Sequence, residues 1–176
     1  MVGSTAIAPC YTPSTMTPAV EPLDGRLFGP DQQCFGCAPH HPAGFHLKFV
    51  ADGDDVVTTL MPQKHHQGPL GLMHGGLIST LADEAAAWAV LATTGKFGFT
   101  TSFEARLSKS VRVGVEVEAR AQVTKSSSRV VRAAVEIRQL GELCFTGDFT
   151  FALLERASAE KLMGGPIPEE WVRFCR

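Results

Sequence analysis

Apolar and polar residues alternate almost without interruption from residue 111 to residue 124. After a short turn, a second alternation runs from residue 131 to residue 138. Strict alternation is typical of a β-strand with one buried face. The apolar residues after the next turn predict a third strand, and these are Leu143, Phe145, Phe149 and Phe151. Together with a strand predicted over 99–107, the C-terminal half of the chain is expected to form a sheet of long strands.

One helix is predicted before these strands. Residues 77–93 contain no proline or glycine and are rich in alanine, which favours a helix of about four or five turns. An apolar stripe at helical spacing should pack on a sheet, and it comprises Leu77, Leu81, Ala85, Trp88 and Ala92. Two shorter strands are predicted earlier in the chain, at 45–49 and 56–60, on either side of a turn.

The order of these elements indicates the fold class. Two short strands, one helix and then about four longer strands in a meander are typical of an α+β domain with a mostly antiparallel sheet. Because the helix is apolar on most sides, we expect the sheet to curve around it. A chain of 176 residues has the size of one domain. We expect a partly ordered N-terminal arm over 1–33, the folded domain over 34–157 and a C-terminal extension over 158–176.

Composition and charge argue against two classes of function. Sixteen basic and eighteen acidic residues give a formal net charge of −2 without a basic stripe, which argues against nucleic-acid binding. No apolar run approaches the ~20 residues of a membrane helix, and the first residues lack the pattern of a signal peptide. Five cysteines at irregular spacing indicate free thiols. We therefore expect a cytoplasmic protein with no nucleic-acid or membrane partner.

Asp83 is the candidate catalytic residue of the predicted helix. Its neighbours three and four positions away are all small and leave space above the carboxylate, and these are Ser79, Thr80, Ala86 and Ala87. Gly75 and Gly76 precede the helix, and Gly76 lies about two turns before Asp83 on the same face. Free N–H groups at a helix start stabilise an oxyanion, and glycines let a carbonyl approach them. With a carboxylate nearby as base or nucleophile, the pattern suits hydrolysis of an activated acyl group.

The same residues also have a simpler interpretation. A single aspartate on a helix is often a solvated charge, and Glu84 could equally be the exposed acid. Two glycines before a helix are common as a plain turn and N-terminal cap. Taken alone, these residues leave both a catalytic and a purely structural interpretation open.

The stretch from His74 to Asp83, HGGLISTLAD, resembles the signature of hotdog-fold thioesterases, in which His-Gly-Gly is followed after six residues by a carboxylate. The resemblance is greatest to the phenylacetic-acid-degradation (PaaI-like) type. The stretch Gln67–Gly71 and the loop Cys34–Cys37 resemble the same group, and the order of elements fits over about residues 34–155.

This resemblance implies a fold, an assembly and an activity. A hotdog fold wraps an antiparallel sheet around one long helix, and two subunits join their sheets in a homodimer, which can pair again into a homotetramer. The activity is hydrolysis of an acyl-CoA to the free acid and CoA, with no metal or organic cofactor. Gly75 would donate its N–H to the thioester carbonyl, and Gly76 would lie next to this contact and help to bind the substrate. His74 would shape the loop. Asp83 of the neighbouring subunit would act as base or nucleophile.

Further substrate contacts are implied outside the signature. A hydroxyl on the strand after the helix would position water, with Thr100 the best match and Thr101 the alternative. CoA would lie near the hairpin between the long strands, at Ser128 and Arg129.

One position departs from the family pattern. Many PaaI-like enzymes carry an asparagine seven residues before the first glycine, where this chain has Gly68. Gln67 or His66 could supply a polar group to the substrate instead.

A metal site is the rival interpretation of the loop that begins at Cys34. Cys34 and Cys37 have the C-x2-C spacing of zinc ligands, and His40 and His41 follow closely. A second ligand pair at a distance is absent, and the loop contains two prolines. We therefore expect two buried thiols and no metal.

Two other functions are compatible with the chain. An acyl-thioester dehydratase or hydratase would place a histidine and a carboxylate on different elements, which the position of His74 directly before the helix disfavours. A sensor or carrier that binds acyl-CoA without hydrolysing it would keep the same pocket, although Asp83 favours catalysis. The acyl group is open between medium-chain and aromatic, since Trp88, Phe103 and the loop Leu70–Met73 could form an apolar pocket.

Overall fold

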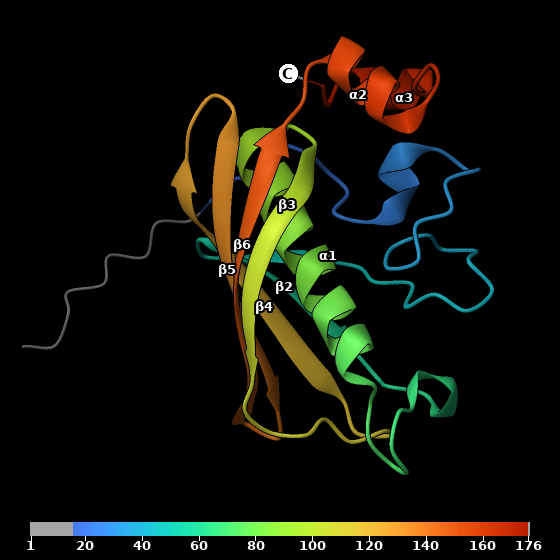
Figure 1. The fold of residues 1–176 in the computed structure, drawn as a ribbon, viewed down its shortest axis with the longest axis vertical. Helices are drawn as coiled ribbons and strands as arrows, with labels where there is room; N and C mark the ends of the chain where they lie inside the picture. The colour runs from blue at the N-terminus through green and yellow to red at the C-terminus, as the bar shows by residue number, and fades with distance from the viewer. Residues whose placement is uncertain (1–15, 176) are drawn as a thin grey trace, which may run out of the picture.

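The computed structural model describes residues 16–175, so Cys10 lies outside the described residues. Six strands form one sheet, and they are β1 (Val50–Asp52), β2 (Asp55–Leu60), β3 (Gly98–Leu107), β4 (Val117–Ser126), β5 (Val130–Gln139) and β6 (Glu142–Leu153). Across the sheet their order is β1-β2-β4-β5-β6-β3, and every neighbouring pair is antiparallel. The helical segments are η1 (Gly25–Phe28), η2 (Lys64–His66), α1 (Gly75–Thr94), α2 (Arg156–Met163) and α3 (Glu169–Val172) (Figure 1).

Local hydrogen bonds fix both ends of α1. The His74 side chain accepts a hydrogen bond from the Gly76 N–H at 3.0 Å and caps the first turn. At the other end Gly95 adopts the left-handed conformation that glycine favours after a helix, and its N–H donates to the Leu91 carbonyl. The helix predicted over 77–93 is confirmed. It begins two residues earlier because its first turn includes both glycines of the signature.

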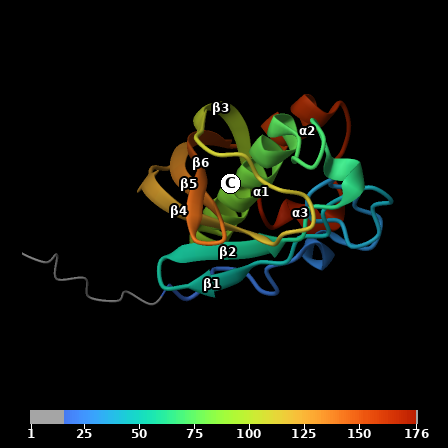
Figure 2. The ribbon, with the colours of Figure 1, turned by 90° about the horizontal axis from the view of Figure 1, so that it is seen from below.

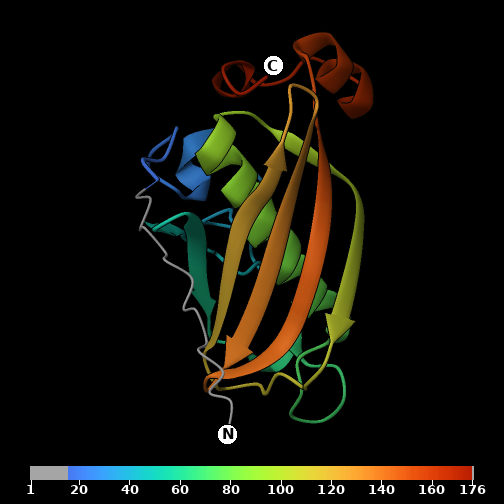
Figure 3. The same ribbon diagram turned by 90° about the vertical axis from the view of Figure 1, so that its left-hand side faces the viewer.

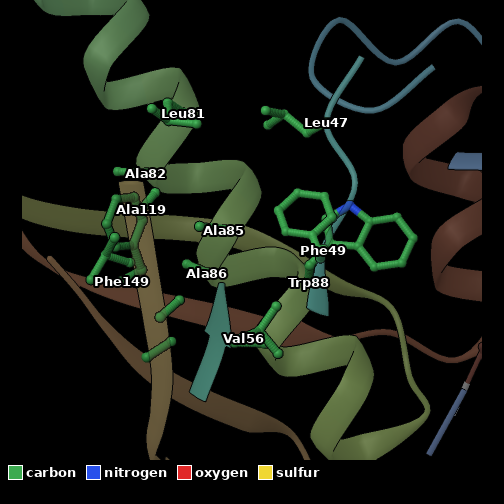
Figure 4. Close-up of a cluster of buried hydrophobic side chains, with 14 of the residues drawn as sticks. Leu47, Phe49, Val56, Leu81, Ala82, Ala85, Ala86, Trp88, Ala119 and Phe149 are labelled. Atoms are coloured by element: carbon green, nitrogen blue, oxygen red, sulfur yellow. The ribbon is translucent and has the colours of Figure 1, made fainter. Parts of the chain in front are cut away.

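The sheet curves around α1, which lies against its concave face (Figure 2). Small residues allow this close approach: Ala82, Ala85 and Ala86 are fully buried in the cluster that surrounds the helix (Figure 4). The sheet contributes large side chains to the same core, and those of β6 are Phe145, Phe149 and Phe151. The expected α+β class, a hotdog fold with a curved antiparallel sheet around one central helix, is confirmed.

Loops and terminal segments cover the side of α1 that faces away from the sheet (Figures 1 and 2). Phe28 of η1 lies in ring contact with Trp88, Phe97, Trp171 and Phe174. The Trp171 indole N–H also donates to the Phe28 carbonyl at 2.9 Å. The predicted arm and extension thus both contribute buried side chains, while the proposed domain limits stay predictions. Within the described part of the chain, no helix combines the length and apolarity needed to cross a membrane.

The strand predicted over 45–49 is wrong. In this segment only Lys48 forms an isolated bridge to another strand-like residue. The N–H groups of Phe45 and Leu47 donate to carbonyls of the loop at 35–36. Contacts with that loop satisfy the backbone in place of sheet pairing, and β1 starts only after this segment.

The strand predicted from residue 111 begins only at Val117, as β4. Gly114 has a φ of 81°, a conformation that breaks an extended strand. The N–H groups of Val113 and Gly114 donate to the carbonyls of Gly71 and Pro62 in the loop before α1. The first residues of the alternating stretch therefore pack against that loop and not in the sheet.

The position of β3 also differs from the expected meander of four strands. β3 pairs with β6 at the edge of the sheet and is separated from β4 by two strands. The connection over 108–116 carries the chain across one end of the sheet before β4 begins (Figure 3). The meander comprises β4, β5 and β6, and β3 forms an edge of the sheet in the described part of the chain.

Candidate functional site

Asp83 lies in the middle of α1 and accepts a hydrogen bond from the Thr100 hydroxyl at 2.7 Å. Thr100 belongs to β3, whose register with β6 shifts between Thr100 and Ser102. This bulge adds one residue, Thr101, and changes which side chain faces the helix. Thr101 donates its own hydroxyl to the Thr150 carbonyl at 3.0 Å. Of the two threonines considered from sequence, Thr100 therefore contacts the helix carboxylate and Thr101 contacts the sheet.

The surroundings of Asp83 favour its protonated form. Burial raises the pKa of Asp83 above its ordinary value, and the hydrogen bond from Thr100 opposes that rise. The hydroxyls of Ser79 and Thr80 donate back to carbonyls of the first turn of α1. Thr100 is thus the polar side chain that holds the carboxylate. A carboxylate with a raised pKa is a stronger base toward water.

The start of α1 offers an unused backbone donor. The N–H of Gly76 donates to the ring Nδ1 of His74, and the N–H of Leu77 donates to the His74 carbonyl. Within residues 16–175 the N–H of Gly75 donates to no group. A free N–H at this end of a helix can bind an oxygen that carries negative charge. His74 orders this turn, and Gly75 presents the donor.

The loop before α1 is held by its own side chains. The side-chain oxygen of Gln67 accepts the Gly71 N–H at 2.9 Å. His66 is buried with Nδ1 accepting a backbone N–H of the same loop, while its Nε2 has no hydrogen-bond partner among the described residues. A Cβ on Gly68 would lie 3.1 Å from the Cα of His74, so the glycine lets the two backbones pack closely. Both polar residues considered from sequence, Gln67 and His66, stabilise the loop in this structure.

Gly75 and Asp83 lie on one helix, eight residues apart. At a rise of 1.5 Å per residue, their positions differ by about 12 Å along the helix axis. A single carbonyl group cannot lie within hydrogen-bond range, about 3 Å, of both.

β3 is an exposed edge strand. It has β6 on one side and, within residues 16–175, no strand on the other, and its residues from Thr100 onward are exposed. Phe103 and Leu107 are 52% and 50% exposed. An exposed apolar edge is a template for pairing with another chain. Leu107 also lies against Gly75. The edge of β3 therefore extends from Thr100, which contacts Asp83, to the start of α1.

Ser128 and Arg129 lie in the exposed turn between β4 and β5. Val130 after this turn pairs with the end of β6, which in turn pairs with the start of β3. The turn is therefore at the end of the molecule where α1 finishes, away from Gly75 of the same chain (Figure 3). The structure does not bring these two residues to the helix start within one chain.

Glu84 is the residue whose environment the sequence did not reveal. Its side chain points at the Cys34–Cys37 loop, with Oε1 in a hydrogen bond at 3.0 Å from the Cys34 Sγ. Burial raises the pKa of Glu84 to about 9, and contact with Cys34 adds to the rise. The Cys37 thiol, and after it Glu84, lower the pKa of Cys34 against the effect of burial, whereas contact with Cys34 raises the pKa of Cys37. The sequence feature that could have indicated this environment is a second acid, with no basic residue nearby, in an alanine-rich helix.

A cavity of about 460 Å³ lies beside this cluster. Its lining is mostly apolar and comes from α1, β3 and both terminal segments, including Phe28, Ala87, Trp88, Phe97, Phe99 and Trp171. Trp88 was expected to line an apolar pocket and does so. Phe103 does not contribute to this lining, because it lies farther along β3 and stacks on Phe149. The loop Leu70–Met73 is also outside it.

Comparison with known proteins links this chain to one family. Residues 70–145, from the loop before α1 to the start of β6, match the family model described as the thioesterase superfamily. A comparison with curated protein sequences finds no match.

Solved structures with the same fold include several described as thioesterases. Thioesterase superfamily member 2 of zebra fish aligns with a TM-score of 0.59 at 22% identity, over 65% of this chain and 89% of that one. A thioesterase from Haemophilus influenzae gives 0.56 at 24% identity, over 61% and 78%. A conserved protein from Pseudomonas aeruginosa gives 0.57 at 25% identity, over 61% and 88%.

Proposed function

Since residues 70–145 match the family model of the thioesterase superfamily, we propose that the chain is a thioester hydrolase that cleaves an acyl-CoA to the free acid and CoA. Water adds to the thioester carbonyl carbon, the C–S bond breaks, and the CoA sulfur leaves and takes up a proton. Asp83 acts as the general base that removes a proton from the attacking water. In the alternative route Asp83 attacks the carbonyl itself, and water then hydrolyses the acyl–aspartyl anhydride.

The hydrogen bond between Thr100 and Asp83 is the observation that carries this proposal. It fixes one carboxylate oxygen of a half-buried acid whose pKa is raised by its surroundings. A carboxylate with one oxygen held and the other free can orient a water molecule for attack. A half-buried acid with a specific hydroxyl partner supports this role over the solvated, purely structural one that the sequence left open.

The Gly75 N–H supplies the second part of the proposed site. It has no acceptor within the described residues, and it lies at the positive end of the α1 dipole. As the thioester carbonyl becomes tetrahedral, negative charge develops on its oxygen. A donor placed at such an oxyanion contributes about 3–4 kcal/mol of transition-state stabilisation in known enzymes.

We infer that the two groups meet in a homodimer. Because they lie about 12 Å apart on one helix, the Gly75 of one subunit must face the Asp83 of its partner copy. The exposed edge of β3, which runs between the two groups, is the surface best suited to join two sheets.

The mostly apolar cavity next to β3 fits the acyl group. Its lining includes Phe99, the residue before Thr100, and several other aromatic side chains. Pockets of roughly 300–1,000 Å³ take small organic ligands, so a medium-chain or an aromatic acyl group is compatible with this volume.

The test is CoA release from a panel of short, medium, long and aromatic acyl-CoAs, followed through the free thiol. Asp83→Asn should lower kcat by at least about 100-fold, the scale of a lost acid–base group. Asp148→Asn makes the same chemical change on an exposed residue of β6 and should leave the rate unchanged. Thr100→Val should slow the reaction, and Thr100→Ser, which keeps the hydroxyl, should restore it.

Other results would redirect the assignment. Wild-type protein that releases no thiol from any thioester, but binds acyl-CoA saturably, would identify a carrier or sensor. Equal rates for wild type and Asp83→Asn would remove Asp83 from the chemistry.

A further inference from the structure

Cys34 and Glu84 meet in a partly buried position although 50 residues separate them in sequence. The Sγ atoms of Cys34 and Cys37 and a carboxylate oxygen of Glu84 all lie within 4.8 Å of one another. With metal–sulfur bonds of about 2.3 Å, ligands of a tetrahedral zinc ion lie roughly 3.5–4 Å apart. Small side-chain movements would therefore bring the three atoms to the spacing that zinc requires.

The backbone is shaped for this close approach. A Cβ on Gly36 would lie only 2.1 Å from the Cγ of Glu84, so any larger residue at this position would displace the carboxylate. Gln32 stabilises the loop from its other side: its side-chain oxygen accepts the Cys34 N–H, and its amide donates to the Gly25 carbonyl. Three potential ligands are thus held by a loop that is itself ordered.

The cluster also has no positively charged side chain paired with it in the described residues. Within residues 16–175, neither Lys nor Arg forms an ion pair with Glu84. Two thiols and a carboxyl in a largely buried position must therefore keep their protons or surround a cation. Thiolates select borderline-soft metals, which favours zinc over magnesium or calcium.

We propose that Cys34, Cys37 and Glu84 form a zinc-class metal site that is open on its fourth side to the apolar cavity. All three residues line that cavity, which gives the ion a path of entry and leaves one coordination position for water or a ligand. Three protein ligands and one open position are the arrangement of catalytic zinc sites, whereas structural sites use four. His40 and His41, the additional ligands considered from sequence, are not part of this group.

The test uses the full chain, kept reduced and stripped of metal with a chelator. Titration with Co²⁺ should give one equivalent per chain with the absorption of cobalt–thiolate bonds, and Zn²⁺ should displace it. Cys34→Ser, Cys37→Ser and Glu84→Gln should each weaken Zn²⁺ binding by at least about 100-fold, which exceeds the effect of outer-shell changes. Cys144→Ser, a change at another buried thiol, should leave the affinity unchanged.

Several outcomes would overturn the site. Reduced wild-type protein that shows no cobalt–thiolate absorption excludes it. A Glu84→Gln variant with wild-type affinity, or loss of binding in His40→Gln or His41→Gln, assigns the metal to a different ligand set. A Cys34–Cys37 disulfide that forms readily in a chain that never binds metal would show a redox pair instead. If Cys37→Ser does not fold, the wild-type titration and Glu84→Gln decide the question alone.

Discussion

Among single residues, side chains of the same type that are adjacent in sequence have different surroundings in the structure. Asp83 and Glu84 are adjacent acids, yet Asp83 faces the hydroxyl of Thr100 and Glu84 faces a thiol from a distant loop. His65 and His66 are likewise adjacent, but His65 is exposed and His66 is only 2% exposed. Their chemistry follows from these surroundings and not from residue type.

His66 should make the stability of the fold depend on pH. Burial, and after it the neighbouring His65, lower the pKa of His66 in the folded chain. The unfolded chain binds a proton near pH 6.5 while the folded chain does not, so stability is lost as pH falls from about 6.5 toward the lowered pKa. The free energy of unfolding should therefore fall between pH 7 and pH 5 in urea titrations.

The variant His66→Asn keeps an acceptor for the backbone but does not titrate, so its stability should change less over this pH range than that of the wild type. His65→Asn removes the exposed histidine and should retain most of the wild-type slope. A slope that is unchanged in His66→Asn would show that other groups cause it.

Among the elements, α1 has two faces with different surroundings. Its alanines lie against the curved sheet, where no space is left, while the side that carries Ala87 faces the cavity. The helix α1 therefore combines a tightly packed face, which carries Ala82 and Ala86, with a face at Ala87 that leaves space for a ligand.

The same substitution on these two faces should have different consequences. Ala82 is fully buried, so Ala82→Leu should lower the free energy of unfolding by about 1–3 kcal/mol through overpacking. Ala87→Leu places the added atoms in the cavity and should change it by less than about 1 kcal/mol. Urea denaturation of both variants gives the comparison, and equal losses would contradict the packing described for α1.

For the whole molecule, the proposed site is incomplete in a single chain. The free edge of β3 and the separation of Gly75 from Asp83 both indicate assembly with a second copy. Catalysis and dimerisation are therefore expected to depend on the same surface.

Phe103→Glu tests this dependence. Placing a charge on the exposed edge of β3 should raise the dimer dissociation constant by at least about tenfold, which corresponds to about 1.4 kcal/mol. Activity per chain should fall in parallel on dilution. Val50→Glu puts the same charge on an exposed apolar residue of β1, at the opposite edge of the sheet, and should leave both quantities unchanged. Analytical ultracentrifugation measures the assembly, and a wild-type monomer at micromolar concentration would rule the dimer site out.

Elements with a local pattern could be predicted from the sequence alone. Period-two alternation identified β5 and β6, and the alanine-rich segment between Gly-Gly and Gly95 identified α1. Both patterns arise because each residue's exposure is set by the geometry of its own strand or helix. The signature from His74 to Asp83 is equally local, since its residues lie on one helix and the turn before it.

Features that depend on contacts between distant residues could not be predicted in this way. Alternation at 111–116 did not produce a strand, because that segment pairs its backbone with the loop before α1. The place of β3 beside β6, and the bulge that directs Thr100 to Asp83, follow from pairing between strands far apart in sequence. The meeting of Glu84 with Cys34 is of the same kind. A local pattern states which face of an element is buried, whereas the packing of the whole chain decides which residue lies against it.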